Sequence, residues 1–174
     1  MKDPDVVESD ERFVIHAPAE VVERLLTDAS AGPQWRTCMQ RGCEASHPVM
    51  LPGTTLHFVV RCFGLSSAYT QIVSQYVPGA MLAWRTTRGK FFVDTTYEWT
   101  EEQGGTRLRC HERLRLPRDK RFVRWLVERQ FLRELRTDHQ RLKRLLETGV
   151  HRYPAPSDRT AGGPRPESLQ GSCD

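Results

Sequence analysis

Alternating apolar and polar positions dominate the middle of the chain and predict an antiparallel sheet. Leu56, Phe58 and Val60 alternate with Thr55 and His57, which places the apolar set on one face of a strand. Segments with this two-residue period are separated by turns that contain glycine at hairpin spacing, which favours a continuous meander. The expected strands cover residues 54–62, 66–77, 80–87, 90–100 and 106–116.

The segment 118–147 has apolar residues at steps of three and four, which predicts a long amphipathic helix. Before the strands, 11–16 predicts a first strand and 17–36 predicts two short helical segments. About seven strands beside one long helix predict an α+β fold of the helix-grip type, in which a curved sheet encloses a cavity against the helix. The expected apolar stripe of the helix is Phe122, Trp125, Leu126, Leu132, Leu135, Leu142, Leu145 and Leu146.

The flanks differ in composition from this region, and we expect one domain over residues 11–149. The polar segment 1–10 is expected to be a flexible lead-in, and 150–174, rich in Pro, Gly and Ser, a disordered tail. No run approaches the roughly 18 apolar residues that span a bilayer, and the N-terminus has no apolar run of signal-peptide length. The five cysteines form no tight framework and fit reduced thiols. These features predict a cytoplasmic protein without stable membrane insertion.

Positive charge is concentrated on the predicted long helix. The net charge is +4, and 118–147 holds ten Lys/Arg against five Asp/Glu. Because acidic residues are interleaved with the arginines and no nucleic-acid module is recognisable, we expect no nucleic-acid partner. An acidic partner, such as a carrier protein that delivers a tethered substrate, would suit these arginines.

Strand parity singles out Glu112. On 106–116, one face carries Leu108, Cys110 and Leu114, and Glu112 shares it. A carboxylate buried among these side chains must be paired, hydrogen-bonded or have a raised pKa. Glu112 is therefore a candidate ligand anchor or general base; the alternative is that it pairs with an Arg or Tyr in the core or lies at a wet strand end. The opposite face, expected in water, carries Arg107, Arg109, His111, Arg113 and Arg115.

Other inward residues are candidates for ligand contact. Tyr97 offers an O–H and is the expected catalytic partner of Glu112, and Trp99 offers an N–H. Trp35 is expected to close the cavity mouth, and plain core packing is the alternative for all three. The full set of expected ligand-contacting residues is Trp35, Leu56, Phe58, Val60, Leu82, Trp84, Val93, Thr95, Tyr97, Trp99, Cys110, Glu112, Trp125 and Leu132.

Motifs for metal, phosphate and nucleophilic chemistry are absent from the sequence. There is no CxxC, HxH or HExxH, so no metal site is expected. There is no GxSxG and no Gly-rich phosphate loop, so no cofactor is expected. An enzyme of this kind would act by proton transfer and positioning.

Several local segments, taken in order, carry a family resemblance: FVIHAPAEVVERLL at 13–26, LPGT at 51–54, VPGAMLAWR at 77–85, TYEW at 96–99, GGTRL at 104–108 and the final amphipathic helix. Together they resemble the START/Bet v 1-like (SRPBCC) superfamily, and within it the bacterial polyketide cyclase/dehydrase branch. The resemblance implies a deep apolar cavity between sheet and C-terminal helix, and relatives include aromatase/cyclases, lipid carriers and self-resistance proteins. It does not imply one reaction.

The expected cavity predicts binding of a hydrophobic small molecule. The resemblance implies that this is a polyketide or related natural product, with a role in natural-product biosynthesis or self-resistance. One alternative is a polyketide cyclase or aromatase that uses inward polar residues as acid and base. A further alternative is a lipid carrier, or an interaction module whose cavity is filled by its own side chains.

Overall fold

The computed structural model describes residues 5–40, 43–62, 64–116 and 123–149. The expected tail at 150–174 and the first residues of the expected long helix, 118–122, lie outside the described residues. In chain order the elements are β1 (Val6–Ile15), α1 (Ala19–Thr27), the short 3-10 helix η1 (Ala29–Ala31), α2 (Gly32–Trp35), β2 (Glu44–Ala45), β3 (Thr55–Cys62), β4 (Leu65–Val77), β5 (Met81–Arg88), β6 (Phe92–Glu102), β7 (Gly105–Arg115) and α3 (Arg124–Thr148).

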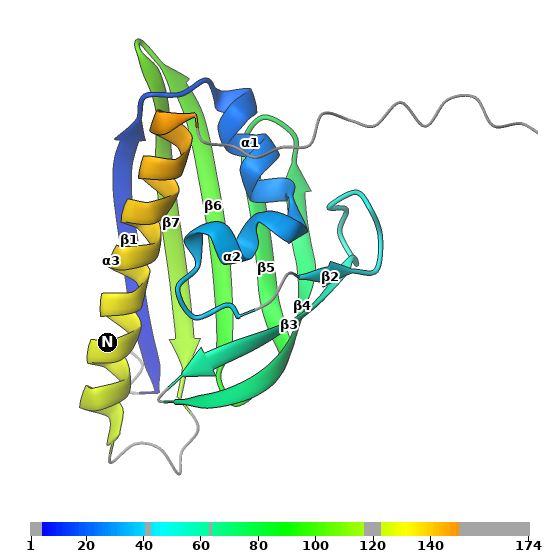
Figure 1. Ribbon diagram of the computed structural model, residues 1–174, viewed down its shortest axis with the longest axis vertical. Helices are drawn as coiled ribbons and strands as arrows, with labels where there is room; N and C mark the ends of the chain where they lie inside the picture. Colours follow the sequence, from blue (N-terminus) through cyan, green and yellow to red (C-terminus); the bar gives the residue numbers. More distant parts are fainter. Residues whose placement is uncertain (1–4, 41–42, 63, 117–122, 150–174) are drawn as a thin grey trace, which may run out of the picture.

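The strands form one seven-stranded antiparallel sheet in the order β1-β7-β6-β5-β4-β3-β2. Figure 1 shows α3 lying along β1 and β7, with α1 and α2 over the same face of the sheet. The β4–β5 pairing carries register shifts at Thr70/Gln71 and Val73/Gln75, and such irregularities bend a strand. The predicted α+β helix-grip fold is confirmed.

The first strand is longer than predicted. It begins at Val6 and pairs with β7 from Val6↔Arg115 to Ile15↔Thr106, so 6–10 is part of the sheet and the expectation of a flexible lead-in over these residues is wrong. The physical reason is pairing: β7 would otherwise present an unpaired edge, and Val7 buries its side chain against Leu114 and Val127.

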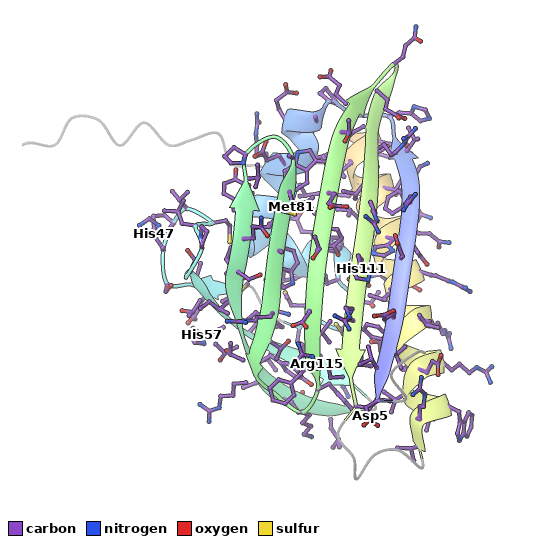
Figure 2. The ribbon with its side chains drawn as sticks, turned by 180° about the vertical axis from the view of Figure 1, so that it is seen from behind. Asp5, His47, His57, Met81, His111 and Arg115 are labelled. Carbon is purple, nitrogen blue, oxygen red and sulfur yellow. The ribbon has the colours of Figure 1, made fainter. Side chains whose placement is uncertain are left out.

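Charge complementarity supports the same register on the outer face of the sheet (Figure 2). Arg109 donates two hydrogen bonds to Asp10 on β1, at 3.0 and 2.8 Å, and a third to Glu98 on β6 at 3.0 Å. Arg113 pairs with Glu8 at 2.8 Å. The predicted outward alternation of β7 is confirmed, with most of its cations paired across strands rather than simply hydrated. Such exposed pairs contribute little stability individually, about 0–1 kcal/mol, and mainly fix register.

Strand parity predicts the sheet core correctly. The inward residues expected at 56–60 of β3 and on β6 and β7 are buried, except Val93 on β6, which is half-buried. On β4, where parity alone leaves the choice open, Tyr69, Gln71 and Val73 point inward. The buried residues of these four strands are Leu56, Phe58, Val60, Tyr69, Gln71, Val73, Thr95, Tyr97, Trp99, Thr106, Leu108, Cys110, Glu112 and Leu114.

The apolar stripe of α3 is only partly as predicted. Leu135, Leu142 and Leu146 are buried, but Trp125 is 65% exposed and Leu126 is 41% exposed. Val127 is the residue that the first turns bury. In the described part of the chain, no helix is both long and apolar enough to cross a membrane.

Candidate functional site

A cavity lies between the sheet and α3. It contains about 940 Å³ of space free of protein atoms, including the space at its open mouth. Most of its wall is apolar, as is usual for small-molecule sites, and a few polar groups are placed within it. Seven of the residues expected to contact a ligand line this cavity: Trp35, Phe58, Val60, Val93, Thr95, Tyr97 and Glu112.

Glu112 is the polar centre of the wall. Its side chain is buried, with the residue only 4% exposed, so the predicted inward orientation is confirmed. The Tyr97 O–H donates to Glu112 Oε1 across 3.4 Å, which is long for an O–H···O hydrogen bond. Burial raises the pKa of Glu112, against the opposing effect of the nearby His139 and Arg36. Glu112 therefore holds its proton to higher pH than an exposed glutamate does.

Tyr97 remains a neutral phenol at ordinary pH. Burial and the neighbouring Glu112 carboxylate raise its pKa well above the usual value. Its ring packs against Trp84 and, edge-on, against Trp35, with centroid separations of 5.3 and 6.2 Å. Tyr97 can therefore donate a hydrogen bond and present an aromatic face within the same wall.

His139 on α3 approaches Glu112 from the helix side. Its Nε2 lies 3.8 Å from Glu112 Oε2, and its Nδ1 lies 2.7 Å from Glu11 Oε2 on β1. His139 is 4% exposed, whereas the Glu11 side chain is about one-third exposed at the edge of the sheet. Since Glu11 accepts at Nδ1, that nitrogen carries the proton, and Nε2 of a neutral imidazole is then an acceptor facing Glu112.

Arg36 supplies a positive charge at the cavity wall. It follows α2, and its guanidinium lies 4.6 Å from the ring centre of Trp35 and 5.0 Å from that of Trp84. Such cation–π contacts hold the planar group between the two rings. Its charge acts on Glu112 and lowers the pKa of that carboxyl, so Arg36 and burial oppose each other there.

Asp138 also borders the cavity, and it ties α3 to the segment after α2. Its Oδ1 accepts hydrogen bonds from the backbone N–H and the side-chain O–H of Thr37, each at 2.7 Å. Asp138 is buried, and these two bonds stabilise its carboxylate. The contact fixes the helix relative to Arg36 and Trp35.

Four buried side-chain atoms in the described residues have no hydrogen-bond partner: Trp84 Nε1, Trp99 Nε1, Glu112 Oε2 and His139 Nε2. An unpaired buried polar atom costs about 1–3 kcal/mol, so each such atom needs an explanation. Two of the four face each other at 3.8 Å, just beyond hydrogen-bond reach.

The other expected ligand contacts lie elsewhere. Leu56 and Trp84 line a second, smaller pocket of about 390 Å³ beneath α1 and α2, which shares Trp35 and Phe58 with the first. Leu82, Trp99 and Cys110 are core residues that line neither pocket. Burial raises the pKa of Cys110, so its thiol stays protonated and a poor nucleophile.

Trp125 and Leu132 do not belong to the site. Trp125 points to solvent, and Leu132 is half-buried and does not line the cavity. The helix presents its N-terminal half to the cavity through Val127, Phe131 and Leu135 instead. In this half of α3 the buried face is therefore rotated about the helix axis relative to the predicted one, which included Trp125.

Sequence reasoning missed the polar residues that α3 and the segment after α2 bring to the wall. The stripe of α3 has a gap between Leu135 and Leu142, and Asp138 and His139 fill the inward positions of that gap. The available signal was that these two polar residues follow Leu135 by three and four positions, which places them on the apolar face of the helix. Arg36 and Glu11 had no such signal. The missed residues of the cavity wall are Arg36, Cys38, Met39, Tyr69, Gln71, Thr86, Phe91, Leu114, Val127, Gln130, Phe131, Glu134, Leu135 and Asp138.

No group of three or more His, Cys, Asp or Glu side chains is arranged to hold a metal ion among the residues with described positions. The polar groups that the described residues bring to the wall and its surroundings include carboxyl, imidazole, phenol, guanidinium, amide and hydroxyl groups.

Residues 6–147 match the family model described as polyketide cyclase/dehydrase and lipid transport. No curated protein matches the sequence. Among solved structures, a Thermus thermophilus protein has a TM-score of 0.69 at 18% identity, covering 82% of this chain and 99% of its own. A START superfamily protein from Mycobacterium smegmatis has a TM-score of 0.67 at 16% identity, with 82% and 99% covered.

A third similar structure is the di-domain ARO/CYC StfQ from the steffimycin biosynthetic pathway. Its TM-score is 0.67 at 11% identity, and the match covers 84% of this chain but 52% of StfQ. The chain thus spans about half the length of that protein. At these identities the structural likenesses show the fold, and the site's chemistry must be argued from its own residues.

Proposed function

Because the chain belongs to the family of polyketide cyclases, dehydrases and lipid-transport proteins, we propose that its cavity binds a hydrophobic small molecule that carries polar oxygen atoms, a polyketide or related natural product. The observation that supports this proposal is the composition of the wall. Apolar side chains dominate it, while Glu112, Tyr97 and Arg36 offer hydrogen bonds and charge at one place. A simple hydrocarbon ligand would offer these groups neither a hydrogen bond nor an opposite charge.

The contacts expected for such a ligand follow from the site. Aromatic rings stack against Tyr97 or Trp35, which already pack edge-on to each other. A carbonyl oxygen accepts a hydrogen bond from the Tyr97 O–H or from a protonated Glu112, and an ionised phenol or enol is favoured by Arg36. This chemistry is common to aromatic polyketides and differs from that of a fatty acyl chain.

Binding can be tested with two probes, the hydroxylated anthraquinone emodin and oleic acid. The quenching of tryptophan fluorescence by each probe measures its affinity. Val60→Phe fills part of the cavity, and Val59→Phe makes the same change on the opposite face of β3 as a matched control. We expect emodin to bind, and its affinity to fall at least about tenfold in Val60→Phe but not in Val59→Phe, because each 1.4 kcal/mol of lost contact is a factor of ten.

Three outcomes would contradict the proposal. Binding of oleic acid without emodin would favour a lipid carrier. Equal affinities in Val60→Phe and wild type would place the ligand outside the cavity. Absence of binding by either probe would leave a domain whose cavity serves no ligand of these classes.

A second candidate function is acid–base catalysis of ring closure or aromatisation on a polyketide chain. It is favoured by the contact of Glu112 and Tyr97 on one part of the wall and by His139 beside Glu112, since such reactions need a shaped pocket and one acid or base. In this mechanism a protonated Glu112 donates to a carbonyl oxygen, or its carboxylate removes a proton beside one. Glu112→Gln would then abolish formation of a cyclised product from a linear polyketide thioester, and unchanged product formation would exclude Glu112 as the acid or base.

The cellular role and a protein partner are part of the proposed function. A role in natural-product biosynthesis or self-resistance, in the cytoplasm, fits a binding site for such a ligand. Arg129, Arg133 and Arg136 are exposed on α3 and suit an acidic carrier protein. If a carrier docks there, its affinity should fall as salt is raised and in a triple Arg→Gln variant at these positions.

A further inference from the structure

The buried pair Glu112 and His139 is joined to solvent by a third residue, Glu11. The three side chains come from three elements and contact one another in sequence: Glu112 on β7, then His139 on α3, then Glu11 on β1. The inner contact is 3.8 Å and the outer one is 2.7 Å. The two inner residues are buried, whereas Glu11 is partly exposed.

The two oxygens of Glu112 face different groups. Oε1 accepts from Tyr97, whose side chain lines the cavity, and Oε2 faces His139 Nε2. A carboxyl group placed in this way can exchange a proton with a ligand through one oxygen and with the imidazole through the other. In the described residues Oε2 and Nε2 have no hydrogen-bond partner, so a proton can pass between them once the 3.8 Å gap closes.

We propose that Glu11, His139 and Glu112 form a proton relay between the cavity wall and solvent, in which Glu112 is the acid–base group and His139 and Glu11 are positioning residues. This inference rests on the acid–base role proposed above for Glu112 and explains how that residue is reset after each proton transfer. The same order of groups, carboxylate, imidazole and reacting group, orients and charges the imidazole in known catalytic triads.

The relay conserves protons at every step. Glu112, as a carboxylate, takes a proton from a ligand and becomes a carboxyl. It passes a proton from Oε2 to His139 Nε2, which closes the 3.8 Å gap. The imidazolium releases its Nδ1 proton to Glu11 across the 2.7 Å contact, and Glu11 passes it to water. Run in reverse, the relay carries a proton from water through Glu11 and His139 to Glu112, which gives it to a ligand oxygen.

Other titratable groups near Glu112 and Glu11 also influence the protonation of the Glu112–His139 pair. Near Glu112 these are Asp138 on α3, Arg36 after α2 and the Tyr97 phenol on β6. Near Glu11, Arg136 on α3 lies 3.8 Å from its Oε1. The ring of His139 is packed against Phe13 and Tyr97, at 5.6 and 6.4 Å between centroids.

The test measures the protonation of Glu112 directly and uses no ligand. The infrared carbonyl band of a protonated carboxyl is followed with pH, and the Glu112 band is the one that Glu112→Gln removes. Compared with wild type are His139→Gln, Glu11→Gln and the double variant. Glu8→Gln is the control for Glu11, because Glu8 lies on β1 but pairs with Arg113 on the outer face, and His57→Gln on β3 is the control for His139.

The direction of each shift separates a relay from a merely structural role. His139→Gln should move the midpoint of the Glu112 band to higher pH, because the carboxylate loses a cationic neighbour. Glu11→Gln should move it the same way, because without Glu11 the imidazolium is less favoured. If Glu11 acted only as a remote negative charge, its removal would shift the midpoint to lower pH.

The double variant should behave like His139→Gln alone, since Glu11 acts through His139. An unchanged midpoint in His139→Gln, a downward or absent shift in Glu11→Gln, or additive shifts in the double variant would each overturn the proposal. So would a change in either control as large as in its partner.

A readout on the wild-type chain keeps the inference testable if a variant does not fold. In isotope-labelled protein, the imidazole nitrogen signals of His139 should show a proton on Nδ1, and a bare Nδ1 would overturn the relay. Failure of emodin to bind would contradict the proposed ligand without changing these infrared and NMR results, so the two proposals fail separately.

Discussion

Replacing Glu112 by glutamine is expected to stabilise the fold at neutral pH. In the folded chain burial raises the pKa of Glu112, whereas an unfolded glutamate titrates near its ordinary value of about 4.3. Between these two pKa values the folded state holds a proton that the unfolded state has lost. Stability therefore falls as pH rises through this window, and above it the full cost of burying the carboxylate is present. The glutamine side chain carries no charge at any pH and avoids that cost.

The magnitude follows from the contacts of the carboxyl. Each unit by which burial raises the pKa costs about 1.4 kcal/mol at neutral pH. Glu112 Oε2 is buried without a hydrogen-bond partner, which typically costs about 1–3 kcal/mol. A glutamine amide keeps the shape, accepts from Tyr97 with its oxygen, and offers its N–H to His139 Nε2 once the 3.8 Å gap shortens. We therefore expect a gain on the order of 1–3 kcal/mol near pH 7.

The assay is urea unfolding of wild type and Glu112→Gln at several pH values between about 4 and 8. The difference in unfolding free energy should be smallest at the acid end and grow toward neutral pH. Glu101→Gln, an exposed change on β6, is the control and should show no such trend. A difference that does not vary with pH, or a variant less stable than wild type at neutral pH, would refute the reasoning.

Two further predictions concern packing. Leu142→Ala should lower the unfolding free energy by about 2–5 kcal/mol, because this leucine is fully buried on α3. Trp125→Ala should change it by no more than about 0.5 kcal/mol, because this side chain is exposed. Equal effects of the two variants in urea titrations would mean that α3 is rotated from the position described. Gly105→Ala should lower the unfolding free energy by about 1–3 kcal/mol, since a Cβ there would lie 2.2 Å from the backbone oxygen of Ile15. An unchanged midpoint of thermal unfolding would show that β1 and β7 lie further apart at this point.

The sheet was predictable because its signal repeats. On β3 and β7 each inward residue is flanked by outward ones, and an error in register by one residue would place every apolar side chain in water. Such a pattern determines a face without knowledge of the partners. The β1 extension to Val6 was missed because residues 6–10 show no alternation of apolar and polar positions. Its Glu8 and Asp10 match Arg113 and Arg109 only once β7 is known to lie beside them.

The site was only partly predictable because its polar groups come from different elements. Glu112 and Tyr97 were found from parity, since β6 and β7 are regular and paired with Tyr97↔Cys110 and Thr95↔Glu112. Arg36 lies in an irregular segment after α2, where no period indicates the direction of a side chain. Glu11 became a partner only through the packing of α3 against β1. Contacts between elements depend on their relative placement, and one sequence does not determine that placement by pattern alone.

The energetic cost of burying Glu112 beside His139 bears on whether the cavity only binds a ligand or also exchanges protons with it. A cavity for purely apolar ligands is served best by apolar walls, and leucines at 112 and 139 would remove two buried atoms that lack hydrogen bonds. The fold instead buries a carboxyl and an imidazole against one another and links the imidazole to a partly exposed carboxylate. Because each unpaired atom lowers stability in the empty protein, the arrangement is favourable only when a ligand or a proton completes it. That requirement favours a ligand with oxygen atoms at this wall over a hydrocarbon chain, and proton exchange with that ligand over passive enclosure.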